Sequence, residues 1–212
     1  EERFYYGFSN EALWPLCHIV YVKPKFDEAD WLIYKSVNQK FANVVLEEVG
    51  SEKAFVFIQD YHFTLLPKML KESRPDLLVA QFWHIPWPNR EAFRICPWGH
   101  EILEGLLGND LMGFHVQYHC NNFLDTVDRN LESRIDYGKF TATKGGKTTH
   151  VRPFPISIDF EELNLLSQEK DVENEMVRMK RELGLKGQII GVGLDRVDYT
   201  KGIPERFKAI DR

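Results

Sequence analysis

The sequence has few cysteines, no long hydrophobic run and no excess of positive charge. Cys17, Cys96 and Cys120 are odd in number and widely spaced, so we expect buried free thiols in a reducing cytoplasm, without disulfides. No apolar run approaches the roughly 20 residues that a membrane-spanning helix needs. The first residues show no signal peptide, although a chain that lacks its true start could hide one. These features predict a cytoplasmic protein without a membrane partner.

The charge balance is mildly acidic. Lys and Arg total 27 against 32 Asp and Glu, a formal net charge of −5. A nucleic-acid partner would favour a basic face, so we expect none. Hydrophobic residues make up 43% of the 212 residues, with fifteen Phe and five Trp, which is enough for a substantial core. The length fits one large domain, or one domain and part of another.

Short apolar runs alternate with amphipathic stretches, which is typical of a parallel sheet with crossover helices. The apolar runs predict buried strands at residues 54–58, 77–82, 110–114 and 188–193. The amphipathic stretches predict helices at 64–72, 89–95, 100–107, 116–131, 161–183 and 202–210. Between these elements we expect a hairpin within 139–151 and an extended, proline-stiffened crossing at 153–159. The expected fold class is therefore α/β, with a Rossmann-like parallel sheet flanked by helices.

Three motif-like patterns do not carry a site. Gly146-Lys147-Thr148 lacks the first glycine of a P-loop, because Thr141 stands there, and a hairpin turn is the better interpretation. The pair Gly191 and Gly193 lacks the third glycine of a dinucleotide-binding fingerprint. His115 and His119 have the spacing of zinc ligands, but no Glu follows His115 and no third ligand is evident. We expect no metal and no cofactor.

Two predicted strands end in polar and aromatic clusters. Asp60 lies in Gln-Asp-Tyr-His directly after the first strand, and His84 begins His-Ile-Pro-Trp-Pro after the second. Ligands of open parallel sheets bind beyond the carboxyl ends of the strands. A carboxylate and an imidazole there could bind sugar hydroxyls, and the aromatic rings could pack on the sugar. Position alone leaves an alternative open: Asp60 caps the next helix and His84 is a core histidine.

Arg196 and Lys201 follow the predicted strand at 188–193 and precede a helix. A helix N-terminus attracts anions, so these two cations could hold a diphosphate. The alternative is ordinary surface charge paired with Asp195 and Asp198.

Six segments together resemble the trehalose-6-phosphate synthase family, in the family's order and over nearly the whole chain. They are residues 5–15 (YYGFSNEALWP), 59–62 (QDYH), 84–88 (HIPWP), 105–114 (GLLGNDLMGF), 155–159 (PISID) and 195–202 (DRVDYTKG). The resemblance implies a GT-B glycosyltransferase, with two Rossmann-like domains that face each other across a cleft. It also implies transfer of glucose from UDP-glucose to glucose 6-phosphate, with retention and without a metal.

The resemblance also implies roles for individual residues. Tyr5 and Trp14 would line the site of the acceptor phosphate, and Asp60 would bind the acceptor sugar near the reacting hydroxyl. His84 would contact the donor glucose, while Arg196 and Lys201 would hold the donor diphosphate.

Three departures from the family pattern bear on the acceptor. Gln59 stands where His is usual, and Ser157 where Gly is usual. Trp83 and the run from Pro86 to Trp98 are similar to an outlying branch that includes glucosylglycerol-phosphate synthases. Glycerol 3-phosphate is therefore an alternative acceptor. A non-catalytic, sugar-phosphate-sensing relative and a bare structural α/β domain are further alternatives. The joint presence of Asp60, His84, Arg196 and Lys201 speaks against a non-catalytic relative. A bare structural domain leaves the aromatic and charged clusters at the strand ends unexplained.

We expect the acceptor-side domain to span residues 1–157, with its N-terminal strand and glycine-rich loop missing. Residues 158–212 would be a linker helix and the first strand and helix of a truncated nucleotide-sugar-binding domain. We therefore expect this chain to be inactive alone and to bind UDP-glucose very weakly. The pattern leaves homo-oligomerisation of the full-length protein open.

Overall fold

The computed structural model describes residues 1–19 and 22–212. The chain divides into two compact units, Glu1–Pro155 and Ile156–Arg212. This division falls two residues before the predicted boundary. The assignment of the units to acceptor and donor sides stays a prediction.

The first unit contains a six-stranded sheet in the order β1-β2-β3-β6-β5-β4. The strands are β1 (Phe55–Gln59), β2 (Leu78–Trp83), β3 (Leu111–Phe114), β4 (Arg134–Asp136), β5 (Thr141–Lys144) and β6 (Lys147–Pro153). The four strands β1, β2, β3 and β6 are parallel, and β5 pairs antiparallel with both β6 and β4. The predicted hairpin is β5–β6, and Gly145 and Gly146 form its turn with φ values of 56° and 80°. Such a turn confirms the hairpin interpretation of the Gly-Lys-Thr segment.

The helices of this unit include a long N-terminal helical region that precedes the sheet. They are the π-helix η1 (Glu2–Leu13), α1 (Trp14–His18), α2 (Glu28–Val49), the 3-10 helix η2 (Tyr61–Phe63), α3 (Leu66–Ser73), α4 (Arg90–Phe93), α5 (Gly99–Leu106) and α6 (Gln117–Asn130). The strands and helices predicted over residues 54–131 are all present, within two residues of their predicted ends. The α/β fold class is thereby confirmed.

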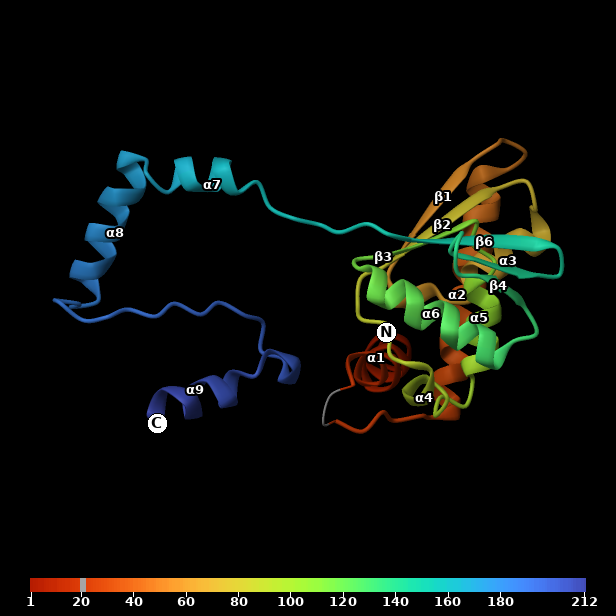
Figure 1. The fold of residues 1–212 in the computed structure, drawn as a ribbon, viewed down its shortest axis with the longest axis horizontal. Coiled ribbons are helices and arrows are strands. Elements are labelled where there is room, and N and C mark those ends of the chain that lie inside the picture. The colour runs from red at the N-terminus through yellow and green to blue at the C-terminus, as the bar shows by residue number, and fades with distance from the viewer. Residues whose placement is uncertain (20–21) are drawn as a thin grey trace. The chain divides into compact units, whose positions relative to one another are not determined.

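One face of the sheet is covered by helices and carries the core (Figure 1). Ile58, Val79, Met112 and Val151 point to this face and are at most 4% exposed. The alternate side chains form the other face, where Phe55 is 65% exposed. A hollow of about 380 Å³ lies on that face, lined largely by phenylalanines of β1 and β2 and by Phe154.

The second unit holds α7 (Phe160–Leu166), α8 (Lys170–Glu182), the 3-10 helix η3 (Tyr199–Lys201) and α9 (Ile203–Asp211). The prediction of a single helix at 161–183 was wrong, because the helix is interrupted between α7 and α8. The Ser167 hydroxyl donates to the carbonyl of Asn164 at 2.7 Å. Such side-chain bonds compete with the helical backbone pattern and favour a break.

The strand predicted at 188–193 was also wrong. These residues adopt no regular structure, and the side chains of Ile189 and Val192 are 103% and 92% exposed. A strand needs a neighbour to accept and donate its backbone hydrogen bonds. No second strand exists among the described residues of this unit, so the apolar run remains unpaired.

Candidate functional site

The carboxyl ends of β1 and β2 bring Asp60 and His84 together. The register pairs Gln59 with Phe82, so the residues that follow the two strands are neighbours. The backbone N–H of His84 donates to Asp60 Oδ1 at 3.2 Å. His84 Nε2 lies 2.7 Å from Gln59 Oε1, and since an amide oxygen can only accept, Nε2 carries the proton of this bond. The cluster predicted from the strand ends is therefore present.

Asp60 has a backbone conformation that is nearly restricted to glycine. Its φ is 64° and its ψ is −170°. A non-glycine residue in this region costs about 1–3 kcal/mol, and such residues are concentrated at functional sites. The carboxylate makes no capping hydrogen bond to η2. The alternative that Asp60 serves as a helix cap therefore does not explain its place.

Burial and hydrogen bonding act on Asp60 in opposite directions. Burial raises the pKa of its carboxyl above the ordinary value, and the hydrogen bond from the His84 backbone N–H lowers it. Burial also lowers the pKa of the neighbouring His62. A carboxylate has about four lone-pair positions, and the His84 N–H takes one of them. Asp60 can therefore accept further hydrogen bonds, such as those from sugar hydroxyls.

Beside Asp60, four aromatic rings form a continuous row. The Tyr5 ring stacks on His62 with centroids 5.4 Å apart, and His62 stacks on Tyr61 at 4.2 Å. Tyr61 in turn contacts Trp14 at 5.9 Å, and its hydroxyl donates to Asn10 Oδ1 at 3.0 Å. The structure thus brings the predicted site residues Tyr5 and Trp14 to the same strand end as Asp60. Aromatic faces of this kind suit the apolar face of a sugar.

The loop after β1 is held in place by helix α2. The Tyr34 hydroxyl donates to the carbonyl of Tyr61 at 2.7 Å and accepts from the backbone N–H of Thr64 at 3.0 Å. Asn38 Oδ1 accepts from the backbone N–H of Leu65 at 3.1 Å. Tyr34 and Asn38 lie one helical turn apart and both are fully buried. These bonds give the loop that carries Asp60 and the aromatic row a rigid base.

His115 is a neighbour of the site that the prediction did not include. It directly follows β3, and its ring lies 5.7 Å from that of His84. Its Nδ1 is buried and has no hydrogen-bond partner among the described residues. The rule that ligands bind at the carboxyl ends of strands would have indicated it. His119, its i+4 neighbour, instead accepts from the backbone N–H of Trp87 at 3.3 Å through Nδ1.

The remaining predicted site residues, Arg196 and Lys201, belong to the second unit. Both are exposed, and Lys201 ends the 3-10 helix η3. Asp198 caps this turn by accepting from the backbone N–H of Thr200 at 2.8 Å. Gly202, with φ of 60°, then turns the chain into α9. Asp195 pairs with Arg206, and within residues 1–19 and 22–212 neither Arg196 nor Lys201 forms a salt bridge. Burial raises the pKa of the Asp198 carboxyl, whereas the bonds from Thr200 and the charges of Arg196 and Lys201 lower it.

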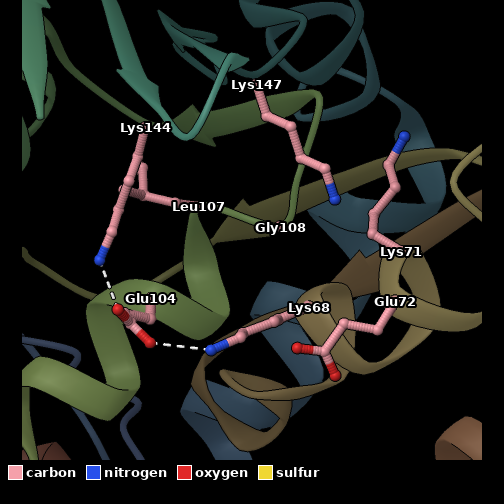
Figure 2. A pocket seen from close by; sticks show the side chains of 8 residues that line it. All are labelled: Lys68, Lys71, Glu72, Glu104, Leu107, Gly108, Lys144 and Lys147. Atoms are coloured by element: carbon pink, nitrogen blue, oxygen red, sulfur yellow. Dashed lines mark hydrogen bonds and ion pairs between the residues drawn. The ribbon is translucent and has the colours of Figure 1, made fainter.

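A second hollow, of about 150 Å³, lies at the opposite, amino-terminal edge of the sheet (Figure 2). Glu104 receives Lys68 Nζ at 2.8 Å and also pairs with Lys144. Lys71 pairs with Asp110 at 2.7 Å. Three of the four lysines that line the hollow are therefore paired with carboxylates, two of them with Glu104. The hollow shares no residue with the Asp60–His84 cluster. We interpret it as a structural ion-pair network.

Two absences apply to the described part of the chain. No helix within residues 1–19 and 22–212 combines the length and the hydropathy that a membrane crossing requires. In the same residues, no three His, Cys, Asp or Glu side chains come together as metal ligands would.

The sequence profile of glycosyltransferase family 20 matches residues 1–212. The chain is 41% identical over 216 residues to a trehalose-6-phosphate synthase of Mycobacterium tuberculosis, covering 98% of this chain and 42% of the relative. It is 40% identical to a trehalose-6-phosphate synthase of Mycolicibacterium smegmatis, with the same coverage. The chain therefore spans less than half the length of these relatives.

Solved structures show the same likeness. An α,α-trehalose-phosphate synthase (UDP-forming) from Burkholderia xenovorans, in complex with glucose 6-phosphate, matches with a TM-score of 0.85 and 28% identity. The match covers 100% of this chain and 46% of that one. A structure from E. coli bound with UDP-2-fluoro glucose matches with a TM-score of 0.83 and 29% identity, over 98% of this chain and 45% of that one.

Proposed function

Because the chain belongs to glycosyltransferase family 20, we propose that it forms the acceptor side of a retaining glucosyltransferase that uses UDP-glucose and glucose 6-phosphate. The observation that carries this proposal is the pairing of Asp60, in its glycine-like conformation, with His84 at adjacent strand ends. Similarity to the Burkholderia protein that binds glucose 6-phosphate supports the acceptor, and similarity to the E. coli protein that binds UDP-2-fluoro glucose supports the donor.

In this proposal the acceptor lies along the aromatic row. Asp60 accepts hydrogen bonds from its ring hydroxyls, near the hydroxyl that reacts. The Trp14 indole Nε1 is buried and has no hydrogen-bond partner among the described residues, so it offers a donor to a phosphate oxygen. The Tyr5 ring is 40% exposed and lies at the open end of the row, where its hydroxyl offers a second donor.

The donor is held by the other predicted residues. His84 contacts the donor glucose, and Arg196 and Lys201 bind the diphosphate together with the N–H groups at the start of α9. As the glucosyl bond breaks, negative charge grows on the leaving phosphate. Two cations and a helix N-terminus are suited to stabilise that charge.

Retention without a protein nucleophile requires the acceptor hydroxyl and the leaving diphosphate to lie on the same face of the sugar. Positioning is then the main catalytic device. The leaving phosphate takes the proton of the acceptor hydroxyl as the new glycosidic bond forms. The task of Asp60 in this step is to fix the orientation of the acceptor.

One observation favours a different acceptor. Gln59 replaces the usual family His and its amide oxygen occupies His84 Nε2. Gln59 also directly precedes Asp60, the residue that binds the acceptor in this proposal. Glycerol 3-phosphate, the acceptor of the glucosylglycerol branch, is therefore the second candidate.

The test is an acceptor panel with UDP-glucose on a full-length polypeptide that carries this chain, with UDP release as the measurement. We expect glucose 6-phosphate to be preferred over glycerol 3-phosphate by at least about tenfold in kcat/KM, because a half-buried carboxylate that loses its hydrogen-bond partners is costly. Asp60→Ala should erode this preference, whereas Asp128→Ala, an exposed carboxylate on α6, should not. The opposite preference would move the protein to the glucosylglycerol branch.

A further inference from the structure

Gln81 is a polar residue in the apolar, helix-covered core. It lies in β2 and is 1% exposed. Burial of an amide is costly unless its hydrogen bonds are made. Both ends of this amide are in fact occupied: Nε2 donates to the carbonyl of Asp60 at 2.8 Å, and Oε1 accepts from Asn109 Nδ2 at 3.1 Å.

The orientation of the Gln81 amide is set by these partners. The carbonyl of Asp60 can only accept, so it requires the NH₂ group of Gln81. Asn109 Nδ2 also donates to the carbonyl of Leu106 at 2.9 Å, which fixes Asn109 as the donor to Oε1. A flipped Gln81 amide would place Oε1 against the carbonyl oxygen of Asp60 and Nε2 against Nδ2 of Asn109. The donor to Asp60 is therefore held in one place by the core behind it.

The bond from Gln81 acts on ψ of Asp60, whereas the strain itself lies in the positive φ. The backbone N–H of Asp60 donates to the carbonyl of Phe82 at 2.7 Å, which fixes the peptide before Asp60. The direction of the Asp60 carbonyl is determined by ψ, and the Gln81 amide holds that carbonyl. Asp60 is thus bonded to β2 twice: its N–H to the backbone of Phe82, and its carbonyl to the side chain of Gln81.

We propose that Gln81 is a positioning residue that holds the backbone of Asp60 in its glycine-like conformation and thereby aims the Asp60 carboxylate at the acceptor. The inference rests on the proposed function, in which Asp60 binds the acceptor sugar. Gln81 itself lies beneath the site and touches no substrate.

The first test is Gln81→Met in a full-length polypeptide that carries this chain. Met has a similar length but no donor, so the Asp60 carbonyl loses its partner. We expect kcat/KM for the acceptor to fall by at least about tenfold, because a misplaced catalytic group is costly far beyond its own contact. The KM for the acceptor should rise while the KM for UDP-glucose stays at the parental value. A general loss of folding would instead lower the apparent kcat and leave both KM values unchanged.

Thr149→Val is the matched control. The Thr149 hydroxyl donates to the carbonyl of Asn109 at 2.8 Å, in the same buried network, but does not reach Asp60. This variant should lose stability and keep parental kinetics. A loss of acceptor kcat/KM equal to that of Gln81→Met would overturn the inference.

Gln81→Glu provides a second test, which can be used even if the Gln81→Met variant folds poorly. Glu keeps the bond from Asn109, and burial raises the pKa of such a carboxyl. When protonated it can donate to the Asp60 carbonyl again. The activity ratio of variant to parent should therefore rise by at least about threefold from about pH 8.5 to about pH 6. A flat ratio would contradict the inference.

A crystal structure of the Gln81→Met polypeptide gives a readout that does not depend on activity. Asp60 should leave its glycine-like conformation, and an Asp60 that keeps φ near 64° and ψ near −170° would overturn the inference. A parent that transfers glucose to no acceptor, with Asp60 displaced in the variant, would contradict the proposed function alone. An active parent with an equally active Gln81→Met variant would contradict the positioning role alone.

Discussion

Glu104→Gln should destabilise the first unit in a manner that depends on pH. Glu104 joins α5 to two other elements, through Lys68 of α3 at 2.8 Å and Lys144 of the β5–β6 hairpin (Figure 2). The substitution preserves the shape of the side chain and removes its charge. It therefore weakens both ion pairs while leaving the hydrophobic packing of α5 in place.

The size of the effect follows from the pKa of Glu104, which its two lysine partners lower from 4.5 to about 2. Each pKa unit corresponds to about 1.4 kcal/mol, so the ceiling is about 3 kcal/mol. The side chains of Glu104, Lys68 and Lys144 are 25%, 45% and 31% exposed, and solvent screens such pairs. We therefore expect a loss of about 1–2 kcal/mol at neutral pH.

The pH dependence has a definite sign. Because the pKa of Glu104 is lowered in the folded state, its stabilisation is complete above the unfolded-state pKa and is lost as the pH falls towards about 2. Urea unfolding followed by tryptophan fluorescence reports this unit, since all five tryptophans lie between residues 14 and 98. The difference between parent and variant should be full at about pH 7 and at most half as large at about pH 3.

Glu101→Gln is the control, because Glu101 pairs with Lys35 only at 3.6 Å and is 51% exposed. It should change the free energy of unfolding by less than about 0.5 kcal/mol. A Glu104→Gln variant as stable as the parent at neutral pH, or a difference that does not change with pH, would refute the ion-pair reasoning.

Three further substitutions test the packing of the first unit and the support of its site, each by urea unfolding. Gly108→Ala should cost about 1–3 kcal/mol, because its Cβ would lie 2.3 Å from the backbone of α3, whereas Gly138→Ala, with 3.4 Å of space, should be nearly neutral. Tyr34→Phe should cost about 1–3 kcal/mol by leaving buried loop groups unpaired, against no loss for the exposed Tyr118→Phe. Asp60→Gly should be at least about 1 kcal/mol more stable than Asp60→Ala, because only Gly relieves the backbone strain.

Over residues 54–131 the sequence predicted the helices and strands well, because the apolar runs are complete strands with partners in the same unit. The helices η1, α1 and α2, which precede the first strand, were not predicted. The same reasoning failed at 188–193, where an equally apolar run has no partner strand among the described residues. Periodicity indicates which residues can be buried, and only the presence of neighbours decides whether they are. The interruption near Ser167 was missed for a local reason, since its hydroxyl competes with the helix and leaves no mark on the hydrophobic pattern.

The residues of the candidate site could be predicted from the sequence, but the residues that hold them in place could not. Asp60 and His84 could be placed from the rule on strand ends. Gln81 could not, because a single polar residue in an apolar strand has many explanations until its two partners are seen. The same rule indicates His115, which directly follows β3, whereas its spacing to His119 indicated only a pair of zinc ligands. The positions of residues that touch a ligand can be predicted from the sheet topology. The residues that orient them can be identified only from the packing of the folded chain.

The strain at Asp60 gives the strongest physical argument that its side chain is needed. Glycine would occupy the same backbone conformation at no cost, so the fold alone gives no reason to place an aspartate there. The chain nevertheless holds Asp60 in place with a backbone bond to Phe82 and an amide from Gln81, and accepts the burial of that amide in an apolar core. The backbone strain at Asp60 and the burial of the Gln81 amide both cost stability. Both are explained if a carboxylate is required at this position and in this orientation. Asp60 is therefore the residue on which we base the proposed acceptor site.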